Sequence, residues 1–261
     1  VTKAKVQDKE QAPRLEVAAK GDRDRRPRGA PKNLPFRAGE TLRYKLTWMG
    51  ISVGEATFTV GENGSFEGKP AWTFAMTART NGFADRIYRV RDELHGWASP
   101  KMKRSLHHTK IAREGSYHRD IVVTFDWKRS EATYRNSKKS YAPRKIQPDT
   151  YDPLSLLYGF RCQQWDKPGD LKISVTDGLK TIRANVRVHK KEEIEIGGEL
   201  IDTWKITPEL KDVGGIFERS KDATMEVWVS TDSRHIPLRL RSKVMVGSFT
   251  ATLVSATGLR R

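Results

Sequence analysis

The chain has 261 residues and a net charge of +17, from 49 Lys and Arg against 32 Asp and Glu. Hydrophobic residues make up 36% of it, enough for a folded protein, but no run of about 18 apolar residues occurs, which excludes a membrane-spanning helix. The single cysteine, Cys162, excludes an intrachain disulfide and leaves the redox compartment open. The charge attracts polyanions in general: nucleic acid, anionic lipid, lipopolysaccharide phosphates and acidic glycans are equivalent at this level, and a plain solvated surface is the alternative.

Residues 1–38 differ in composition from the rest. They carry 11 Lys or Arg, 5 acids and four prolines with almost no large apolar residue, so they cannot bury enough surface to offset the entropy of ordering. We expect a disordered or extended basic arm over residues 1–38 and a single folded domain over residues 39–258. The arm contributes +6 of the charge and leaves +11 on the remainder, so the folded part is basic in its own right.

From Phe36 onward the sequence alternates with a period of two. In residues 41–48 four apolar side chains alternate with polar ones, which is typical of a strand with one buried face: Leu42, Tyr44, Leu46 and Trp48. Gly50 predicts a tight turn into a second strand that ends near Val60. Similar segments follow, separated by turn residues, at 71–80, 86–98, 104–113, 117–127, 131–136, 171–177, 180–190, 192–198, 200–210, 224–232, 237–244 and 247–256.

About a dozen strands with almost no helix between them require antiparallel neighbours. No repeat of fixed period is visible, which argues against a propeller or a solenoid. Because so many strands must hide their edges, we predict a mainly β fold. It is one large curved antiparallel sheet that forms an open or half-closed barrel, in preference to two separate sandwiches.

A single central helix is predicted at residues 152–162. Asp152 followed by Pro153 is a start signal, because the carboxylate can accept from free amides of the first turn and proline suits the first helical position. Apolar residues then recur at helical spacing in a wide stripe. A barrel of about a dozen strands is too wide to be filled by its own side chains, so we expect the helix on the open side of the sheet. Beside it lies either an apolar cleft for a ligand or a solid core.

No catalytic or metal site is predicted. His107 and His108 are adjacent, so on a strand they point in opposite directions and cannot chelate one ion together. Ser155 lacks the Gly-x-Ser-x-Gly turn, and Cys162 has no placed histidine partner. The glycine-rich residues 61–68 are not followed by the Lys-Ser/Thr of a phosphate loop. We therefore expect a protein that is not an enzyme and that needs no cofactor.

Three segments resemble, in order and spacing, the exported bacterial proteins of the domain of unknown function 3108 family. They are GETLRYKLTWMGISVGEATFTV at 39–60, YDPLSLLYGFR at 151–161 and MEVWVSTDSRHIPLRLRSKVMVGSFTATL at 225–253. The resemblance covers most of residues 36–258 and leaves out the basic arm. It implies a periplasmic or cell-envelope location after removal of a signal peptide, and a fold similar to the large open barrels of the lipoprotein-carrier type. It implies no reaction.

The positions that match the family's motifs each have a structural explanation as well, as turn, cap or core residues. They are Trp48, Gly50, Gly54, Asp152, Ser155, Tyr158, Arg161, Trp228, Asp232 and Pro237.

Arg161 is the most informative charge, because it continues the apolar stripe of the helix. A buried guanidinium needs a matching anion, so its partner is either an internal Asp or Glu, which we favour, or the phosphate or carboxylate of a ligand. In the second case the protein binds an amphiphile. The candidate ligand-binding residues are Trp48, Leu157, Tyr158, Arg161 and Trp228.

Two non-enzymatic functions follow. The first is an envelope protein that holds an apolar or amphiphilic, lipid-like and anionic ligand in a cleft between helix and sheet. The alternative is an envelope scaffold whose basic surface binds anionic cell-wall polymer, lipopolysaccharide or a protein partner. Nucleic acid is not an expected partner, because the aromatic residues alternate inward with the apolar set, whereas stacking platforms need them outward. The oligomeric state stays open.

Overall fold

The structure is a computed structural model that describes residues 14–17, 25–62, 64–209, 224–243 and 247–261. Sixteen of the described strands form one sheet, and two more form a small separate hairpin. The strands are β1 (Arg14–Val17), β2 (Thr41–Trp48), β3 (Ile51–Val60), β4 (Ser65–Phe66), β5 (Lys69–Pro70), β6 (Trp72–Thr80), β7 (Arg91–Ala98), β8 (Ser105–Glu114), β9 (Tyr117–Asp126), β10 (Glu131–Asn136), β11 (Arg144–Lys145), β12 (Thr150–Tyr151), β13 (Gly169–Thr176), β14 (Thr181–Ile196), β15 (Glu199–Pro208), β16 (Thr224–Ser230), β17 (Pro237–Lys243) and β18 (Ser248–Leu259).

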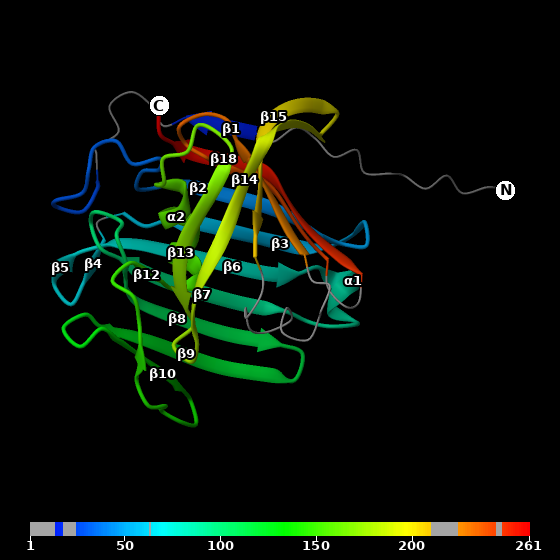
Figure 1. The fold of residues 1–261 in the computed structure, drawn as a ribbon. Helices are drawn as coiled ribbons and strands as arrows, with labels where there is room; N and C mark the ends of the chain where they lie inside the picture. Colours follow the sequence, from blue (N-terminus) through cyan, green and yellow to red (C-terminus); the bar gives the residue numbers. More distant parts are fainter. Residues whose placement is uncertain (1–13, 18–24, 63, 210–223, 244–246) are drawn as a thin grey trace.

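The sheet is open and strongly curved (Figure 1). Its order is β11-β10-β9-β8-β7-β6-β3-β2-β18-β17-β16-β15-β14-β13-β12, with β1 beside β18. The two ends of this order, β11 and β12, are not paired with each other among the described residues, so the barrel does not close there. The predicted fold class, a mainly β protein with one large half-closed sheet, is confirmed.

Three details of the sheet differ from the prediction. Two pairs are parallel, β12 with β13 and β1 with β18, whereas antiparallel neighbours were expected throughout. The two strands expected at 180–190 and 192–198 are one long strand, β14. An irregularity in its pairing with β15, between Val188 and Lys191, interrupts the alternation that the sequence pattern depends on.

The central helix is α2 (Pro153–Arg161), and it lies inside the curve of the sheet (Figure 1). It contacts β6 and β7 on one side and β12 and β13 on the other, which are distant from each other in the strand order. The ring of Tyr158 stacks on that of Phe74 with centroids 3.9 Å apart, and Phe36 packs edge-on against both. The helix therefore joins the two halves of the sheet through a shared core.

Asp152 fixes the start of α2, as the sequence predicts. Its Oδ1 accepts from the backbone N–H groups of Leu154 and Ser155 at 2.9 Å each. Its Oδ2 accepts from the Ser105 hydroxyl of β8 at 2.6 Å, and His108 Nδ1 lies 3.2 Å from Oδ1. One buried carboxylate thus caps the helix and fastens it to the sheet.

Arg161 fixes the end of α2 through an ion pair with Glu40. Its Nη1 and Nη2 donate to the two carboxylate oxygens at 2.5 and 3.1 Å, and both side chains are buried, at 1% and 0% exposed. Further donations go to the carbonyl oxygens of Pro35 and Arg234. The favoured prediction, an internal acid as the partner of Arg161, is confirmed.

A second, four-residue helix, α1 (Gly82–Asp85), lies in the connection before the strand that the sequence predicted at 86–98. It begins at Asn81, whose side chain accepts from Ala84 N, and β7 starts only at Arg91. Four residues are too few to give a helical period in the sequence, which is why the pattern missed it.

Part of the region expected to be a basic arm packs on the domain. Leu34 and Phe36 are buried in the core around α2 at 9% and 3% exposed, and residues 14–17 form β1. The folded domain therefore includes residues that precede the predicted boundary at residue 39. Residues 1–13 and 18–24 of the expected arm lie outside the described residues.

We expect Glu40→Gln to lower the free energy of unfolding by about 3–5 kcal/mol, because it leaves the Arg161 guanidinium buried without a counter-charge. The double variant Glu40→Leu/Arg161→Met is expected to lose less than the single variant, since no unpaired charge remains. Urea denaturation measures both. The matched control is Asp170→Asn, which breaks the exposed pair with Arg187 and is expected to change nothing measurable. If Glu40→Gln were as stable as the native chain, the buried ion pair would not have this role.

The buried carboxylate of Asp152 should make the free energy of unfolding depend on pH. Burial alone would raise the pKa of Asp152, but the nearby His108 and the hydrogen bond from Ser105 outweigh it and hold this pKa below its usual 3.8. A depressed pKa stabilises the fold above the ordinary value, and that stabilisation is lost as the pH falls through the folded-state pKa. The free energy of unfolding should therefore fall more steeply below about pH 4 in the native chain than in Asp152→Asn, which keeps a capping oxygen. Urea denaturation at a series of pH values measures this. If the free energy of unfolding depended on pH in the same way in the native chain and in Asp152→Asn, this role of Asp152 would be refuted.

Candidate functional site

The structure places the three predicted helix residues in the interior. Tyr158 is fully buried, Arg161 is 1% exposed, and Leu157 packs partly buried against the same core cluster. In this packing the guanidinium of Arg161 faces Glu40 and not an open cleft. A ligand between α2 and the sheet stays a prediction.

The two predicted tryptophans lie elsewhere on the sheet. Trp48 ends β2 and is 38% exposed at the turn into β3. Trp228 is on β16 and is 7% exposed; its Nε1 donates to Glu192 Oε1 at 2.5 Å and the ammonium of Lys205 lies 5.5 Å from its ring centroid. The five predicted residues are therefore not one site.

A groove of about 530 Å³ does contain one of them. It runs over neighbouring strands β2, β18, β17 and β16, on the face opposite to the side that carries the buried Leu42 and Leu238. Cations and hydroxyl groups dominate its lining, and no acid is among the lining residues that the structure describes. They are Lys45, Thr47, Gly50, Trp228, Arg239, Arg241, Ser248, Thr250 and Thr252.

Strand register arranges these side chains in two rows. In the first row Trp228 pairs with Arg239, Arg239 with Thr252, and Thr252 with Lys45. The second row pairs Arg241 with Thr250, and Thr250 with Thr47. Side chains directly opposite each other on antiparallel strands lie about 5 Å apart, so each row is a continuous band of donors.

Among the described residues, two of the cations in the groove form no ion pair, although an acid stands opposite each in the strand register: Glu55 opposite Lys45 and Glu226 opposite Arg241. Both acids pair with other cations, Glu55 with Arg43 and Glu226 with Lys205. A guanidinium and an ammonium with hydroxyl donors between them suit a phosphate or carboxylate group. We name this surface the basic groove.

The sequence indicates which side chains of the basic groove share a face of one strand, but not which strands lie next to each other. Arg239 and Arg241 are two residues apart on one strand, as are Thr250 and Thr252, so alternation alone places each pair on one face. That these strands adjoin β2, from the other end of the chain, follows only from the strand order.

A second, smaller hollow of about 260 Å³ lies at the other end of the strands, where β6 begins and β18 ends. Buried Leu34, Phe36 and Trp72 line it together with Arg26, Pro31, Lys32, Arg37, Arg260 and Arg261. Arg260 donates to the Leu34 carbonyl, and Arg26, Arg37 and Arg261 also have interaction partners. This hollow is therefore built largely from cations that already have contacts.

Ser105, His108 and Asp152 lie together, but their arrangement differs from a catalytic triad. The serine donates to the carboxylate instead of to the histidine, and the same carboxylate caps α2. All three side chains are buried. The cluster anchors the helix.

The Cys162 thiol and the metal-ligand side chains of the described residues do not point to a catalytic or metal site. Burial raises the pKa of the Cys162 thiol to about 12, so it stays protonated at neutral pH. The described residues hold no group of three His, Cys, Asp or Glu side chains placed to bind a metal. Neither helix of the described chain is long and apolar enough to cross a membrane.

Comparison with known proteins agrees with this fold. No curated protein matches the sequence. Among solved structures, the chain is similar to the crystal structure of a beta-barrel-like protein of domain of unknown function DUF1849 from Brucella abortus, with a TM-score of 0.52 and 11% sequence identity. The match covers 84% of this chain and 97% of the other, and at this identity it concerns the fold alone. Residues 43–254 match the family described as protein of unknown function DUF3108, and the chain belongs to that family.

Proposed function

We propose that this protein is a non-enzymatic binding protein of the cell envelope that takes an anionic, lipid-like amphiphile, with the anionic head in the basic groove. The observation that carries the proposal is that Lys45 and Arg241, which form no ion pair among the described residues, stand in bands of hydroxyl donors. Hydrogen bonds from a guanidinium or an ammonium to a phosphate or carboxylate group are stronger than those between neutral groups.

The surroundings of the groove suit an amphiphile better than a bare anion. The groove reaches Thr47, Gly50 and Ser248, next to Trp48, Met49 and Ile51, which are 38%, 62% and 52% exposed. An apolar chain that leaves the groove at this end would cover these side chains, and each buried methylene group contributes about 0.8 kcal/mol.

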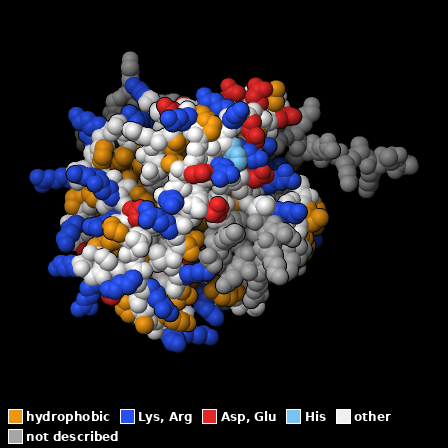
Figure 2. Space-filling view, viewed as in Figure 1, with side chains coloured by type: hydrophobic (Ala, Val, Ile, Leu, Met, Phe, Trp, Pro, Cys, Tyr) orange, Lys and Arg blue, Asp and Glu red, His pale blue; other side chains and the backbone are white. Residues whose placement is uncertain are grey.

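The overall charge supports an anionic partner. Figure 2 shows Lys and Arg side chains over much of the visible face, while acidic side chains gather near the β14–β15 hairpin. Glu192, Glu193, Glu195 and Glu199 of that hairpin are exposed. The envelope location belongs to the proposal and follows from the resemblance to exported proteins.

The test uses soluble probes with and without acyl chains. We expect dihexanoyl phosphatidic acid to bind the full chain, measured by isothermal titration calorimetry, and glycerol 3-phosphate and dihexanoyl phosphatidylcholine to bind more weakly. Lys45→Gln/Arg241→Gln should weaken binding of the phosphatidic acid by about tenfold or more, because each lost ionic hydrogen bond is worth about 1.5–3 kcal/mol.

The matched control removes the same charge elsewhere. Lys128→Gln/Lys138→Gln replaces two exposed cations on the turns before and after β10, far from the groove in the strand order, and should bind like the native chain. Equal losses in both double variants would show that only net charge matters, as expected for the alternative, a scaffold for anionic polymers. Equal binding of glycerol 3-phosphate would remove the amphiphile from the proposal.

A further inference from the structure

The turns at one end of the sheet form a continuous rim. Because β2, β6 and β8 run in the same direction, their carboxyl ends lie together, as do the turns that follow them. Asn81 binds the carbonyl oxygens of Ser52 and Val53 at 2.8 Å, which joins the first two turns. Tyr88 Oη donates to the Glu114 carbonyl at 3.1 Å, which joins the second to the third.

This rim is apolar and exposed. Of the ten large hydrophobic side chains exposed in the described residues, six stand on these turns or on the first residue of the strand that follows, and Trp48 ends the strand before the first turn. Hydrophobic side chains are visible along the edge of Figure 2 where Figure 1 places α1 and the β2–β3 turn. We name as the apolar rim Met49 (62% exposed), Ile51 (52%), Phe83 (56%), Ile87 (70%), Tyr88 (51%) and Tyr117 (44%).

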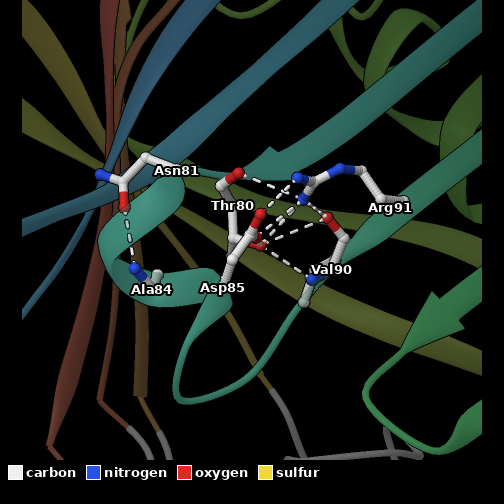
Figure 3. A network of polar contacts seen from close by, with 6 residues as sticks. All are labelled: Thr80, Asn81, Ala84, Asp85, Val90 and Arg91. Carbon is white, nitrogen blue, oxygen red and sulfur yellow. Dashed lines mark hydrogen bonds and ion pairs between the residues drawn. The ribbon is translucent and has the colours of Figure 1, made fainter.

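A network of polar contacts fixes α1, the helix that carries Phe83 of the rim (Figure 3). Asp85 Oδ2 accepts from Arg91 at 2.6 Å, its Oδ1 accepts from Arg91 and from Thr80, and Asn81 caps the helix. Phe83 and Ile87 stand on either side of this fixed carboxylate in the sequence. Their exposure therefore comes from a defined local structure.

The β2–β3 turn exposes a hydrophobic side chain at a conformational cost. Met49 has φ +48° and precedes Gly50 at +81°, positions that two-residue hairpin turns usually fill with Asn-Gly or Asp-Gly. A methionine in the left-handed region is unfavourable for local folding, and such strain persists mainly where function uses it.

The acidic side chains near the rim already have ion-pair partners, and Arg89 adds to the positive charge that lowers the pKa of Asp85. Asp85 pairs with Arg91, Glu114 with Lys110 and Asp120 with Arg113, at 2.6, 2.9 and 2.7 Å. By contrast, Arg86 and Arg89 are exposed beside Ile87 and Tyr88, and within the described residues neither forms an ion pair.

We propose that the apolar rim docks on the surface of an anionic lipid bilayer. Phe83, Ile87 and Met49 would enter the boundary between head groups and acyl chains, where tyrosine rings are also favoured, and Arg86 and Arg89 would contact lipid phosphates. Side chains projecting from several separate turns suit a soft lipid surface, and their excess positive charge is complementary to anionic head groups. This inference goes beyond the proposed function: Met49 and Ile51 also stand where an acyl chain would leave the basic groove, but the other four rim residues do not adjoin the groove, and Phe83 and Ile87 carry the test.

Co-sedimentation of the full chain with vesicles tests the docking. We expect binding to phosphatidylcholine vesicles that contain about one third phosphatidylglycerol, and much weaker binding to pure phosphatidylcholine. Phe83→Ser/Ile87→Ser should weaken the binding by about tenfold or more. Arg86→Gln/Arg89→Gln should weaken it by about thirtyfold. The matched control Leu179→Ser/Leu200→Ser removes two hydrophobic side chains that are 39% and 68% exposed, one on the turn after β13 and one at the start of β15, and should sediment like the native chain.

The rim variants change exposed residues, so the fold should persist, and urea denaturation checks this. Lys45→Gln/Arg241→Gln should still sediment, which separates failure of the groove from failure of the rim. Equal binding to pure phosphatidylcholine, or an equal loss in the leucine control, would overturn the docking. So would self-association of the chain without vesicles that Phe83→Ser/Ile87→Ser abolishes, since the rim would then be a protein interface.

Discussion

The buried pair of Arg161 and Glu40 is the constraint on which the rest of the structure depends. Glu40 directly precedes β2, Arg161 ends α2, and the guanidinium also binds the carbonyl oxygen of Arg234 before β17. Desolvation of two charges is expensive unless geometry and hydrogen bonds are nearly ideal, so an arrangement of these three segments that separated the pair would leave a buried charge without compensation. Asp152 constrains the other end of the helix in the same way. Together the two anchors hold α2 across the inside of the curved sheet.

Interior and exterior charges are handled differently in this protein. Inside, Arg161 and Asp152 are matched by partners from distant segments, so they are committed to the fold. Outside, Lys45 and Arg241 in the basic groove and Arg86 and Arg89 on the rim form no ion pair among the described residues, because the acids near them pair with other cations. The +17 charge is thus not evenly neutralised. Part of the positive charge outside ion pairs stands at places that also offer hydroxyl donors or apolar side chains, which suit a lipid head group and the layer below it.

The sequence predicts local structure well where a pattern is complete. The alternation in residues 41–48 predicts β2 with its bounds, and Asp152-Pro153 predicts the start of α2. It also predicts that the buried guanidinium of Arg161 needs an anionic partner, with an internal Asp or Glu as the favoured one. It cannot identify Glu40, which lies 121 positions away, because an ion pair has no period. Assembly of the basic groove was missed for the same reason. Trp48 and Trp228 are both motif tryptophans, yet one ends a strand at the rim and the other is covered by Glu192 and Lys205.

The brevity of the two outermost strands affects how copies of this protein behave in concentrated solution. A free strand of ordinary length is a template on which another chain can grow by backbone pairing, the first step toward fibres. Here the two outermost strands are Arg144–Lys145 and Thr150–Tyr151, of two residues each, and the first is exposed and cationic. They offer too few amide and carbonyl groups to nucleate such growth, and like charges repel an approaching copy. Among the described residues, the sixteen-stranded sheet therefore ends at both sides in strands that are poor templates for another copy.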